Sequence, residues 1–355
     1  MSEQIAFVFP GQGSQAVGMG ADAAAASPAA RAVFALADRA VSFPLSELCF
    51  SGPEETLRET INTQPAIVAT SLALLAAMQE AAGATTPASD AEPPLHAPLT
   101  PAFMAGHSVG EYTALAATGA LGIAETIRLV RERGRLMHDE GTRCPSGMAA
   151  VLGLDAETLR AVCAEATAQA EAELAADGTT EEVPDRHPGA GRVVLANDNA
   201  PGQIVISGAT RALELAMELA RARSAKRVVP LAVSGAFHSP VMAPAAAGLA
   251  RAVAAAPLRE AQVPLVANIT ARPVTLAGDL RTELAEQIAA PVQWTASVAY
   301  LAEQGVTTFV EIGAGQVLSG LIKRIAKGSQ TLSVASMADV APVAAQLRTR
   351  MGLAG

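Results

Sequence analysis

The sequence predicts an α/β or α+β fold. Short apolar runs that end at glycines or polar turns alternate along the chain with segments of helical periodicity. Half of the 355 residues are hydrophobic, but only 3% are aromatic. The core therefore has to consist of small aliphatic side chains in closely packed helices and strands, and the length allows one large domain or two smaller ones.

The expected elements begin close to the N-terminus. Residues 5–9 are apolar throughout and end at Pro10 and Gly11, which is typical of a buried strand that enters a tight turn. Further strand-like runs lie at residues 102–105, 149–152, 193–195, 204–206, 228–233, 263–266 and 308–312. Helical patterns cover residues 28–41, 67–82, 112–119, 123–138, 156–176 and 211–222.

Two segments interrupt this alternation. Residues 84–101 are rich in proline, and residues 177–191 are rich in Asp, Glu, Gly and Pro. Both compositions predict exposed loops or disordered inserts, and we assign them no chemistry.

Charge, hydropathy and cysteine content exclude several classes of protein. With 34 acidic and 25 basic side chains the chain has a net charge of −9, whereas nucleic-acid-binding domains usually present a basic face. The longest charge-free apolar stretch, residues 60–79, contains polar residues and Pro65, so we expect no membrane span. The N-terminal residues lack the features of a signal peptide, which favours a cytoplasmic protein. Three distant cysteines fit neither a disulfide framework nor a zinc site, and we expect no metal.

The strongest local motif is G-x-S-x-G at residues 106–110, between a strand-like run and a helix-like segment. This is the context of a nucleophile elbow, in which a turn too tight for side chains at the two glycine positions holds Ser108 at its tip. The helix that follows directs N–H groups and its positive dipole end at charge developing on a bound acyl group. The alternative is a glycine-rich loop with an incidental serine.

A serine nucleophile needs a base, and His238 is the best candidate among the five histidines. It follows the strand-like run 228–233, where an α/β sheet presents functional loops. His96 and His187 lie in the two inserts, His138 ends a helical segment, and His107 adjoins the serine, from which its side chain should diverge. A helix-capping role for His238 stays open.

Arg133 lies on the helical segment 123–138, at the edge of its apolar stripe and apart from the basic face of Arg128, Arg131 and Arg135. A lone guanidinium at the border of a core usually pairs with a carboxylate of the protein or of a ligand. An ordinary helix-surface charge is the alternative.

The turn at residues 10–16 fits G-x-G-x-x-A, but a dinucleotide-binding unit also needs a second strand ending in an acidic residue about 20 residues later. Residues 28–41 are helical in pattern instead. The glycines can allow backbone N–H groups to approach a bound oxyanion.

Eight short stretches together resemble one known family over nearly the whole chain. They are residues 9–15 (FPGQGSQ), 63–66 (TQPA), 106–112 (GHSVGEY), 133–134 (RG), 199–203 (NAPGQ), 237–239 (FHS), 291–294 (PVQW) and 309–313 (FVEIG). This set resembles the malonyl-CoA:acyl carrier protein transacylase family. The inserts 84–101 and 177–191 depart from the shorter family pattern without touching these stretches.

The resemblance implies an α/β-hydrolase-like large subdomain, residues 1–143 and 233–355, with an inserted ferredoxin-like small subdomain, residues 144–232. The active site would lie between the two. The implied roles are Ser108 as acylated nucleophile, His238 as its base, Arg133 as the partner of the malonyl carboxylate, and the N–H groups of Gln12 and Val109 as the oxyanion hole. Gln293 matches the residue near the histidine, which this family orients by carbonyl groups. Phe237 and Val109 resemble the bulky residues of malonyl-selective members, and the roles of Gln64, Asn199 and His107 are open beyond possible pocket lining.

The implied activity is transfer of a malonyl group from malonyl-CoA to the phosphopantetheine thiol of acyl carrier protein, through malonyl-Ser108 and without a bound cofactor. A fatty-acid carrier is favoured over a polyketide carrier. Carrier proteins are generally acidic, so a local basic patch is expected, with candidates Lys323, Arg324 and Lys327, joined by Arg221, Arg223 and Lys226.

Two other hypotheses about the function are compatible with parts of the sequence. A serine esterase or thioesterase would use the same elbow, but its triad runs Ser, acid, His, whereas Glu311 follows His238. The second is a carrier-protein docking module without activity, against which the complete set of Ser108, His238 and Arg133 argues.

Overall fold

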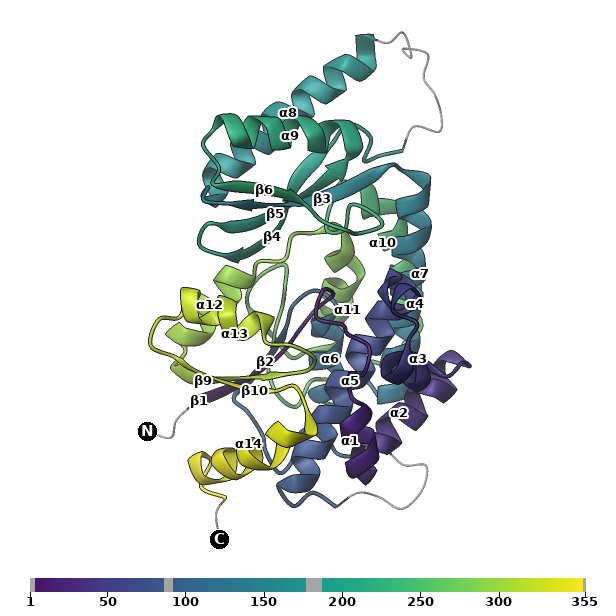
Figure 1. Cartoon of the computed structure of the whole chain (residues 1–355), viewed down its shortest axis with the longest axis vertical. Coiled ribbons are helices and arrows are strands. Elements are labelled where there is room, and N and C mark those ends of the chain that lie inside the picture. The colour runs from purple at the N-terminus through teal and green to yellow at the C-terminus, as the bar shows by residue number, and fades with distance from the viewer. Residues whose placement is uncertain (1–3, 86–91, 177–186, 354–355) are drawn as a thin grey trace.

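The computed structural model describes residues 4–85, 92–176 and 187–353, which form two sheets with helices around them (Figure 1). The larger sheet has six strands in the order β10-β9-β1-β2-β7-β8. All neighbours in it are parallel except β7 and β8. Its strands are β1 (Gln4–Phe9), β2 (Phe103–Gly106), β7 (Leu265–Val266), β8 (Pro273–Val274), β9 (Val306–Ile312) and β10 (Gln330–Val334).

Helices cover both faces of this sheet, as a buried parallel sheet requires. In Figure 1, α12 and α13 lie on one side and the helices from α1 to α7 lie mostly on the other. The set is α1 (Ala21–Ala26), α2 (Pro28–Val41), α3 (Leu45–Ser51), α4 (Glu54–Arg58), α5 (Thr60–Ala81), α6 (Gly110–Ala117), α7 (Ile123–Arg143), α10 (Ala243–Ala255), α11 (Ala277–Glu286), α12 (Trp294–Glu303), α13 (Val317–Ile325) and α14 (Met337–Arg350), with short 3₁₀ turns η1 (Pro240–Met242) and η2 (Gln287–Ala289).

The smaller sheet is antiparallel and lies apart from the first (Figure 1). Its strands are β3 (Ser146–Leu152), β4 (Val193–Ala200), β5 (Gln203–Ala209) and β6 (Arg227–Pro230), in the order β4-β5-β3-β6. Helices α8 (Ala156–Ala176) and α9 (Thr210–Ala222) cover one face. The order β-α-β-β-α-β along the chain is that of a ferredoxin-like unit. The predicted mixed α/β fold is therefore confirmed, while the exact subdomain boundaries at 143/144 and 232/233 stay predictions.

Helix α5 is long and apolar enough to cross a membrane by length and composition, but 94% of its most apolar window is buried inside the protein. It packs as a core helix against α2 and α7. The helix begins seven residues earlier than the pattern predicted and contains Pro65. Proline has no N–H to bond the carbonyl of Ile61, and the Arg131 guanidinium donates to that carbonyl instead at 2.7 Å.

Three other expectations differ from the structure. Strand β6 ends at Pro230, three residues short of the expected end, and α7 continues past His138 to Arg143. The described part of the proline-rich insert is not all exposed, because Leu95 and Leu99 are buried and their carbonyls accept hydrogen bonds from the Gln79 side chain. Residues 86–91 and 177–186 of the two inserts lie outside the described residues.

Candidate active site

Ser108 occupies the tip of a sharp turn between β2 and α6, with a φ of 53°. A Cβ at Gly106 would lie 2.0 Å from the backbone of Gly110, and a Cβ at Gly110 would lie 2.2 Å from the carbonyl oxygen of Phe9. Both glycines are therefore required sterically, as the motif predicted. The turn has the shape of a nucleophile elbow.

His238 meets Ser108 from a loop 130 residues later, with its Nε2 atom 2.7 Å from the serine Oγ. The other ring nitrogen, Nδ1, lies 3.0 Å from the carbonyl oxygen of Gln287 and 3.1 Å from that of Ala290. Carbonyl oxygens only accept, so Nδ1 carries the proton and Nε2 accepts the Ser108 hydroxyl. Burial, together with the nearby positive charge of Arg133, lowers the pKa of His238 to about 3. The imidazole is consequently a neutral base at physiological pH.

Arg133 is 1% exposed, which is deeper than the stripe edge where the sequence placed it. Its Nη1 donates to Gln64 Oε1 at 2.5 Å, and its Nη2 donates to Gln287 Oε1 at 2.9 Å and to Ser108 Oγ at 3.3 Å. No carboxylate among the described residues forms an ion pair with it, and its buried Nε has no hydrogen-bond partner there. A buried guanidinium whose hydrogen-bond acceptors are two amides and a hydroxyl, all uncharged, is matched to an incoming anion.

These side chains line one cavity of about 280 Å³ between the two sheets. Ser108, Arg133, Phe237 and His238 contribute from one side, and β3 and β5 contribute Met148 and Val205 from the other. The cavity is thus polar at the nucleophile and apolar around it, as is usual for a small-molecule site.

Gln12 and Val109 also line the cavity. Neither backbone N–H donates a hydrogen bond to any described residue. Val109 directly follows the nucleophile and Gln12 lines the same cavity, so both N–H groups stay candidates for an oxyanion hole.

The other candidates fall into two groups. Asn199 and His107 line the cavity and hydrogen-bond to each other at 2.7 Å, and burial lowers the pKa of His107. Gln64 is not part of the cavity wall, but its amide oxygen accepts a hydrogen bond from Arg133. Gln293 differs from the expectation: its side chain donates to the carbonyl of Ile269 and is not part of the cavity wall. The residue beside the histidine is Gln287, whose carbonyl oxygen lies 3.0 Å from His238 Nδ1. Gln287 belongs to none of the sequence motifs described above.

Gln287, Asn268 and Glu111 were missed as site residues. Asn268 follows β7 by two residues, so its place at the end of a strand was a usable signal. Glu111 was part of the quoted motif but received no role. Gln287 lies in the short turn η2 and has no local pattern that marks it.

Two further expectations are settled by hydrogen bonds. Glu311 accepts the N–H groups of Leu318 and Ser319 at 3.0 and 2.7 Å, so it caps the start of α13 and does not orient His238. His187 was expected in a loose loop, but its Nε2 lies 2.8 Å from the buried carboxylate of Glu140.

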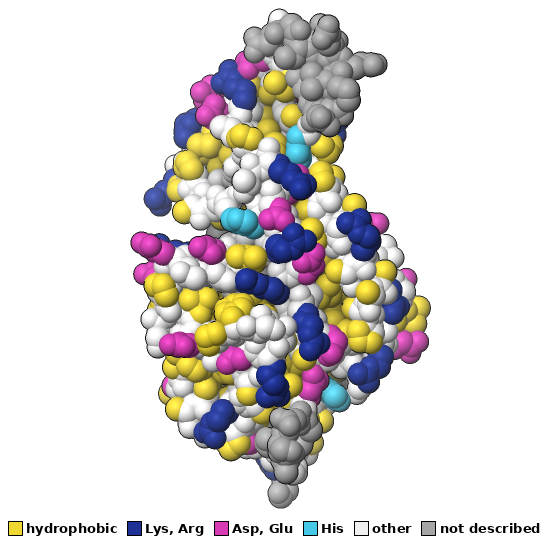
Figure 2. Space-filling model, turned by 90° about the vertical axis from the view of Figure 1, so that its right-hand side faces the viewer, with side chains coloured by type: hydrophobic (Ala, Val, Ile, Leu, Met, Phe, Trp, Pro, Cys, Tyr) yellow, Lys and Arg dark blue, Asp and Glu magenta, His cyan; other side chains and the backbone are white. Residues whose placement is uncertain are grey.

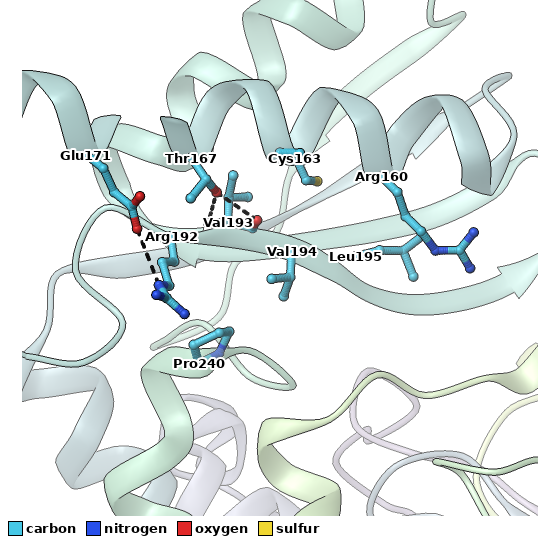
Figure 3. A pocket seen from close by; sticks show the side chains of 10 residues that line it. Arg160, Cys163, Thr167, Glu171, Arg192, Val193, Val194, Leu195 and Pro240 are labelled. Carbon is cyan, nitrogen blue, oxygen red and sulfur yellow. Dashed lines mark hydrogen bonds and ion pairs between the residues drawn. The ribbon is translucent and has the colours of Figure 1, made fainter. Parts of the chain in front are cut away.

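A second cavity, of about 390 Å³, lies between α8 and β4 (Figure 3). Thr167 hydrogen-bonds both backbone groups of Val193 there, and Arg192 pairs with Glu171 at 3.4 Å. The described lining of this cavity includes no serine or histidine. Within the described residues no cluster of His, Cys, Asp and Glu could hold a metal ion.

Comparison with known proteins decides the family. The model of the acyl transferase domain matches residues 6–186 and 163–345. Malonyl CoA-acyl carrier protein transacylase of Bacillus subtilis (strain 168) is 42% identical over 331 residues, 93% of each chain. The chain belongs to the malonyl-CoA:acyl carrier protein transacylase family.

Other members agree in sequence and in shape. The Escherichia coli (strain K12) transacylase is 39% identical over 97% of this chain and 99% of its own. The crystal structure of the Xanthomonas oryzae transacylase superposes with a TM-score of 0.83, at 39% identity over 98% of this chain and 99% of that one. A malonyl-transacylase in complex with a type II polyketide synthase acyl carrier protein gives a TM-score of 0.84, at 35% identity over 97% of this chain and 100% of that one.

Proposed function

We propose that this chain is a malonyl-CoA:acyl carrier protein S-malonyltransferase of fatty-acid biosynthesis. The observation that carries the proposal is the Ser108–His238 pair at 2.7 Å beside a buried Arg133 that has no carboxylate partner among the described residues. The pair supplies acyl-transfer chemistry. The guanidinium can bind the carboxylate at the far end of a malonyl group, which favours malonyl as the acyl group that is transferred.

In the first half-reaction, His238 Nε2 takes the proton of Ser108 as Oγ attacks the thioester carbon of malonyl-CoA. The N–H groups of Gln12 and Val109 hold the oxyanion. Collapse of the intermediate breaks the carbon–sulfur bond, and the CoA thiolate leaves with the proton from His238. The product is malonyl-Ser108.

The second half-reaction reverses these steps with a new thiol. His238 takes the proton of the phosphopantetheine thiol of acyl carrier protein, the sulfur attacks the malonyl ester, and Ser108 recovers its proton. Because CoA leaves before the carrier protein reacts, the kinetics should be ping-pong. No step needs a bound cofactor.

Arg133 is proposed to select the malonyl group. An acetyl group would leave the buried guanidinium unpaired, which costs about 1–3 kcal/mol. Phe237 is buried beside the base and lines the same cavity, so its ring is proposed to limit the space around the acyl α-carbon.

The carrier protein is proposed to dock beside the end of α13. Lys323 and Lys327 are exposed there, and the start of the same helix lines a small cavity that shares Gln12 and Asn199 with the Ser108 cavity. Arg324 is exposed as well, but it donates to the carbonyl of Pro201 at 2.7 Å and to the side chain of Gln203. It therefore also links α13 to the turn between β4 and β5 of the smaller sheet.

Other basic surfaces suit an acidic partner less well. Arg223 of the second candidate group already pairs with Glu165 at 2.8 Å. On the face shown in Figure 2, Lys and Arg side chains are interspersed with Asp and Glu. We also propose a cytoplasmic location, since the three cysteines are buried free thiols, as is usual in a reducing compartment.

The proposal is tested by following the fate of the malonyl group. Purified protein is incubated with malonyl-CoA in the presence and absence of holo acyl carrier protein, and malonyl carrier protein and free malonate are both quantified. We expect fast loading of the carrier and slow release of malonate. Rapid malonate release with no carrier loading would identify a thioesterase, and neither product would indicate a docking module.

A further inference from the structure

A fully buried acidic side chain, Glu111, directly follows the nucleophile elbow, in the first turn of α6. Each of its oxygens accepts from a different segment. Oε1 accepts the backbone N–H of Asn268 at 2.9 Å, and Oε2 accepts from the side-chain amide nitrogen of Gln287 at 2.5 Å. Such a carboxylate would be costly to bury without these donors, so Glu111 joins α6 to two loops of the large subdomain.

Both partners of Glu111 contact the reacting groups. Asn268 Oδ1 accepts the N–H of Ser108 at 2.8 Å, while its Nδ2 donates to the carbonyl of Gly106 at 2.7 Å. The amide nitrogen of Gln287 also donates to the carbonyl of Ser108 at 2.8 Å. Its amide oxygen accepts from Arg133 at 2.9 Å.

Glu111 and the Ser108 carbonyl therefore set the orientation of the Gln287 amide together, and Glu111 is the side chain of the two acceptors. Because the carboxylate accepts from the amide nitrogen, the amide oxygen faces the guanidinium. A flipped amide would direct its NH₂ at Arg133, where two donors oppose each other, and its oxygen at two acceptors. With the amide in place, Gln64 and Gln287 hold Arg133 from two sides.

We propose that Glu111 is a positioning residue, which fixes the amide of Gln287 and through it holds Arg133 where a substrate carboxylate can bind. This inference rests on the proposed role of Arg133. Glu111 itself contacts neither substrate nor the reacting atoms.

Glu283, the second buried glutamate next to Glu111, serves as the control residue. It is 6% exposed and accepts the N–H of Ile269 at 2.9 Å, and it makes no hydrogen bond to Gln287 or Arg133. Burial raises the pKa of both carboxyl groups. The Glu283 side chain also hydrogen-bonds to that of Glu111, so one carboxyl group of the pair carries the proton between them. A glutamine at 283 can donate to Glu111 through its NH₂ group, whereas a glutamine at 111 has one oxygen in place of two and cannot accept both N–H groups from their present positions.

The experiment compares Glu111→Gln with Glu283→Gln in the full chain. For each variant, kcat/KM is measured with malonyl-CoA and with acetyl-CoA, using holo acyl carrier protein as acceptor, and the fold is checked by thermal melting. We expect Glu111→Gln to lower the malonyl-to-acetyl ratio about tenfold, mainly through KM for malonyl-CoA, since one buried hydrogen bond to a charged group is lost. Glu283→Gln should leave the ratio unchanged.

The same substitution is repeated in an Arg133→Ala background. There Glu111→Gln should change the ratio less than about twofold, because its effect passes through the missing guanidinium. An equal loss on both acyl groups, or the same drop in ratio without Arg133, would overturn the positioning role. If Glu111→Gln does not fold, Glu111→Asp, which keeps the charge and withdraws it by one methylene, takes its place with the same criteria. An unchanged ratio in Arg133→Ala alone would instead contradict the proposed role of Arg133.

Discussion

At Ser108 and His238 the backbone adopts positive φ angles of 53° and 57°, which residues with a side chain rarely adopt. Such strain persists only where the surroundings hold it. Asn268 and Gln287 bond the backbone of Ser108 on both sides, and the N–H of His238 donates to the carbonyl of Ile288 at 2.9 Å. The two reacting groups are therefore positioned before substrate arrives.

The lowered pKa of His238 predicts an unusual acid limb in the pH profile. A histidine acts as a base only when neutral, so its activity is lost as pH falls through its pKa in the folded protein. With that pKa near 3, the rate of Ser108 acylation should stay nearly flat from about pH 7.5 to 5.5, whereas a histidine of pKa about 6.5 would lose about tenfold. Single-turnover acylation by quenched flow measures this. A tenfold fall centred near pH 6.5 would contradict the described burial of His238.

The residues that could be predicted are those whose chemistry requires a local pattern. Ser108 needs two flanking glycines, and His238 follows a strand-like run. Gln287 could not be found in this way, because its role depends on contacts with Ser108, Glu111 and Arg133, which lie 154 to 179 residues earlier, rather than on its neighbours in the chain. The sequence pointed to Gln293, six residues away, whose side chain satisfies a loop carbonyl.

Among the elements, the elbow and α13 offer a matched pair of glycine substitutions. Gly110→Ala should destabilise the protein by about 3 kcal/mol, since its Cβ would meet the Phe9 carbonyl oxygen at 2.2 Å and the backbone cannot yield there. Gly320→Ala, in α13 with nothing within 4 Å of the added Cβ, should stabilise it by about 0.5–1 kcal/mol. Thermal or urea unfolding measures both. Equal effects of the two substitutions would mean that the turn between β2 and α6 is looser than described.

The periodicity of the sequence predicted which segments are strands and which are helices, but it did not predict where several of them begin or end. The first turns of α5 are polar and contain Pro65, and the Arg131 side chain from α7 bonds the Ile61 carbonyl that the proline cannot. Strand β6 ends at Pro230, although the N–H of the next residue, Leu231, still donates to the carbonyl of Met148 in β3 at 2.9 Å. The start of α5 therefore depends on a tertiary partner that a local pattern does not contain.

At the scale of the whole molecule, a protein of net charge −9 has to bind an acidic carrier through a local patch. Lys323→Glu combined with Lys327→Glu should raise KM for carrier protein about tenfold at low salt and less at high salt, with little change in KM for malonyl-CoA. Arg324 is spared because it also bonds Pro201 and Gln203.

The control for this patch carries the same change of charge elsewhere. Arg58 and Arg128 are exposed residues with nearby glutamate partners on α4 and α7. Their replacement by Glu should leave KM for carrier protein nearly unchanged. If both double variants weaken the carrier equally, net charge rather than the end of α13 governs docking.

The proposed reaction requires that malonyl is carried on Ser108, beside a guanidinium that holds its carboxylate. Intact-protein mass after brief incubation with malonyl-CoA, followed by peptide mapping and a chase with holo acyl carrier protein, tests it most directly. We expect one malonyl group on Ser108, none in Ser108→Ala, a much weaker acetyl adduct from acetyl-CoA, and loss of the malonyl group to the carrier. A malonyl group on another residue, or an adduct that the carrier cannot remove, would contradict it.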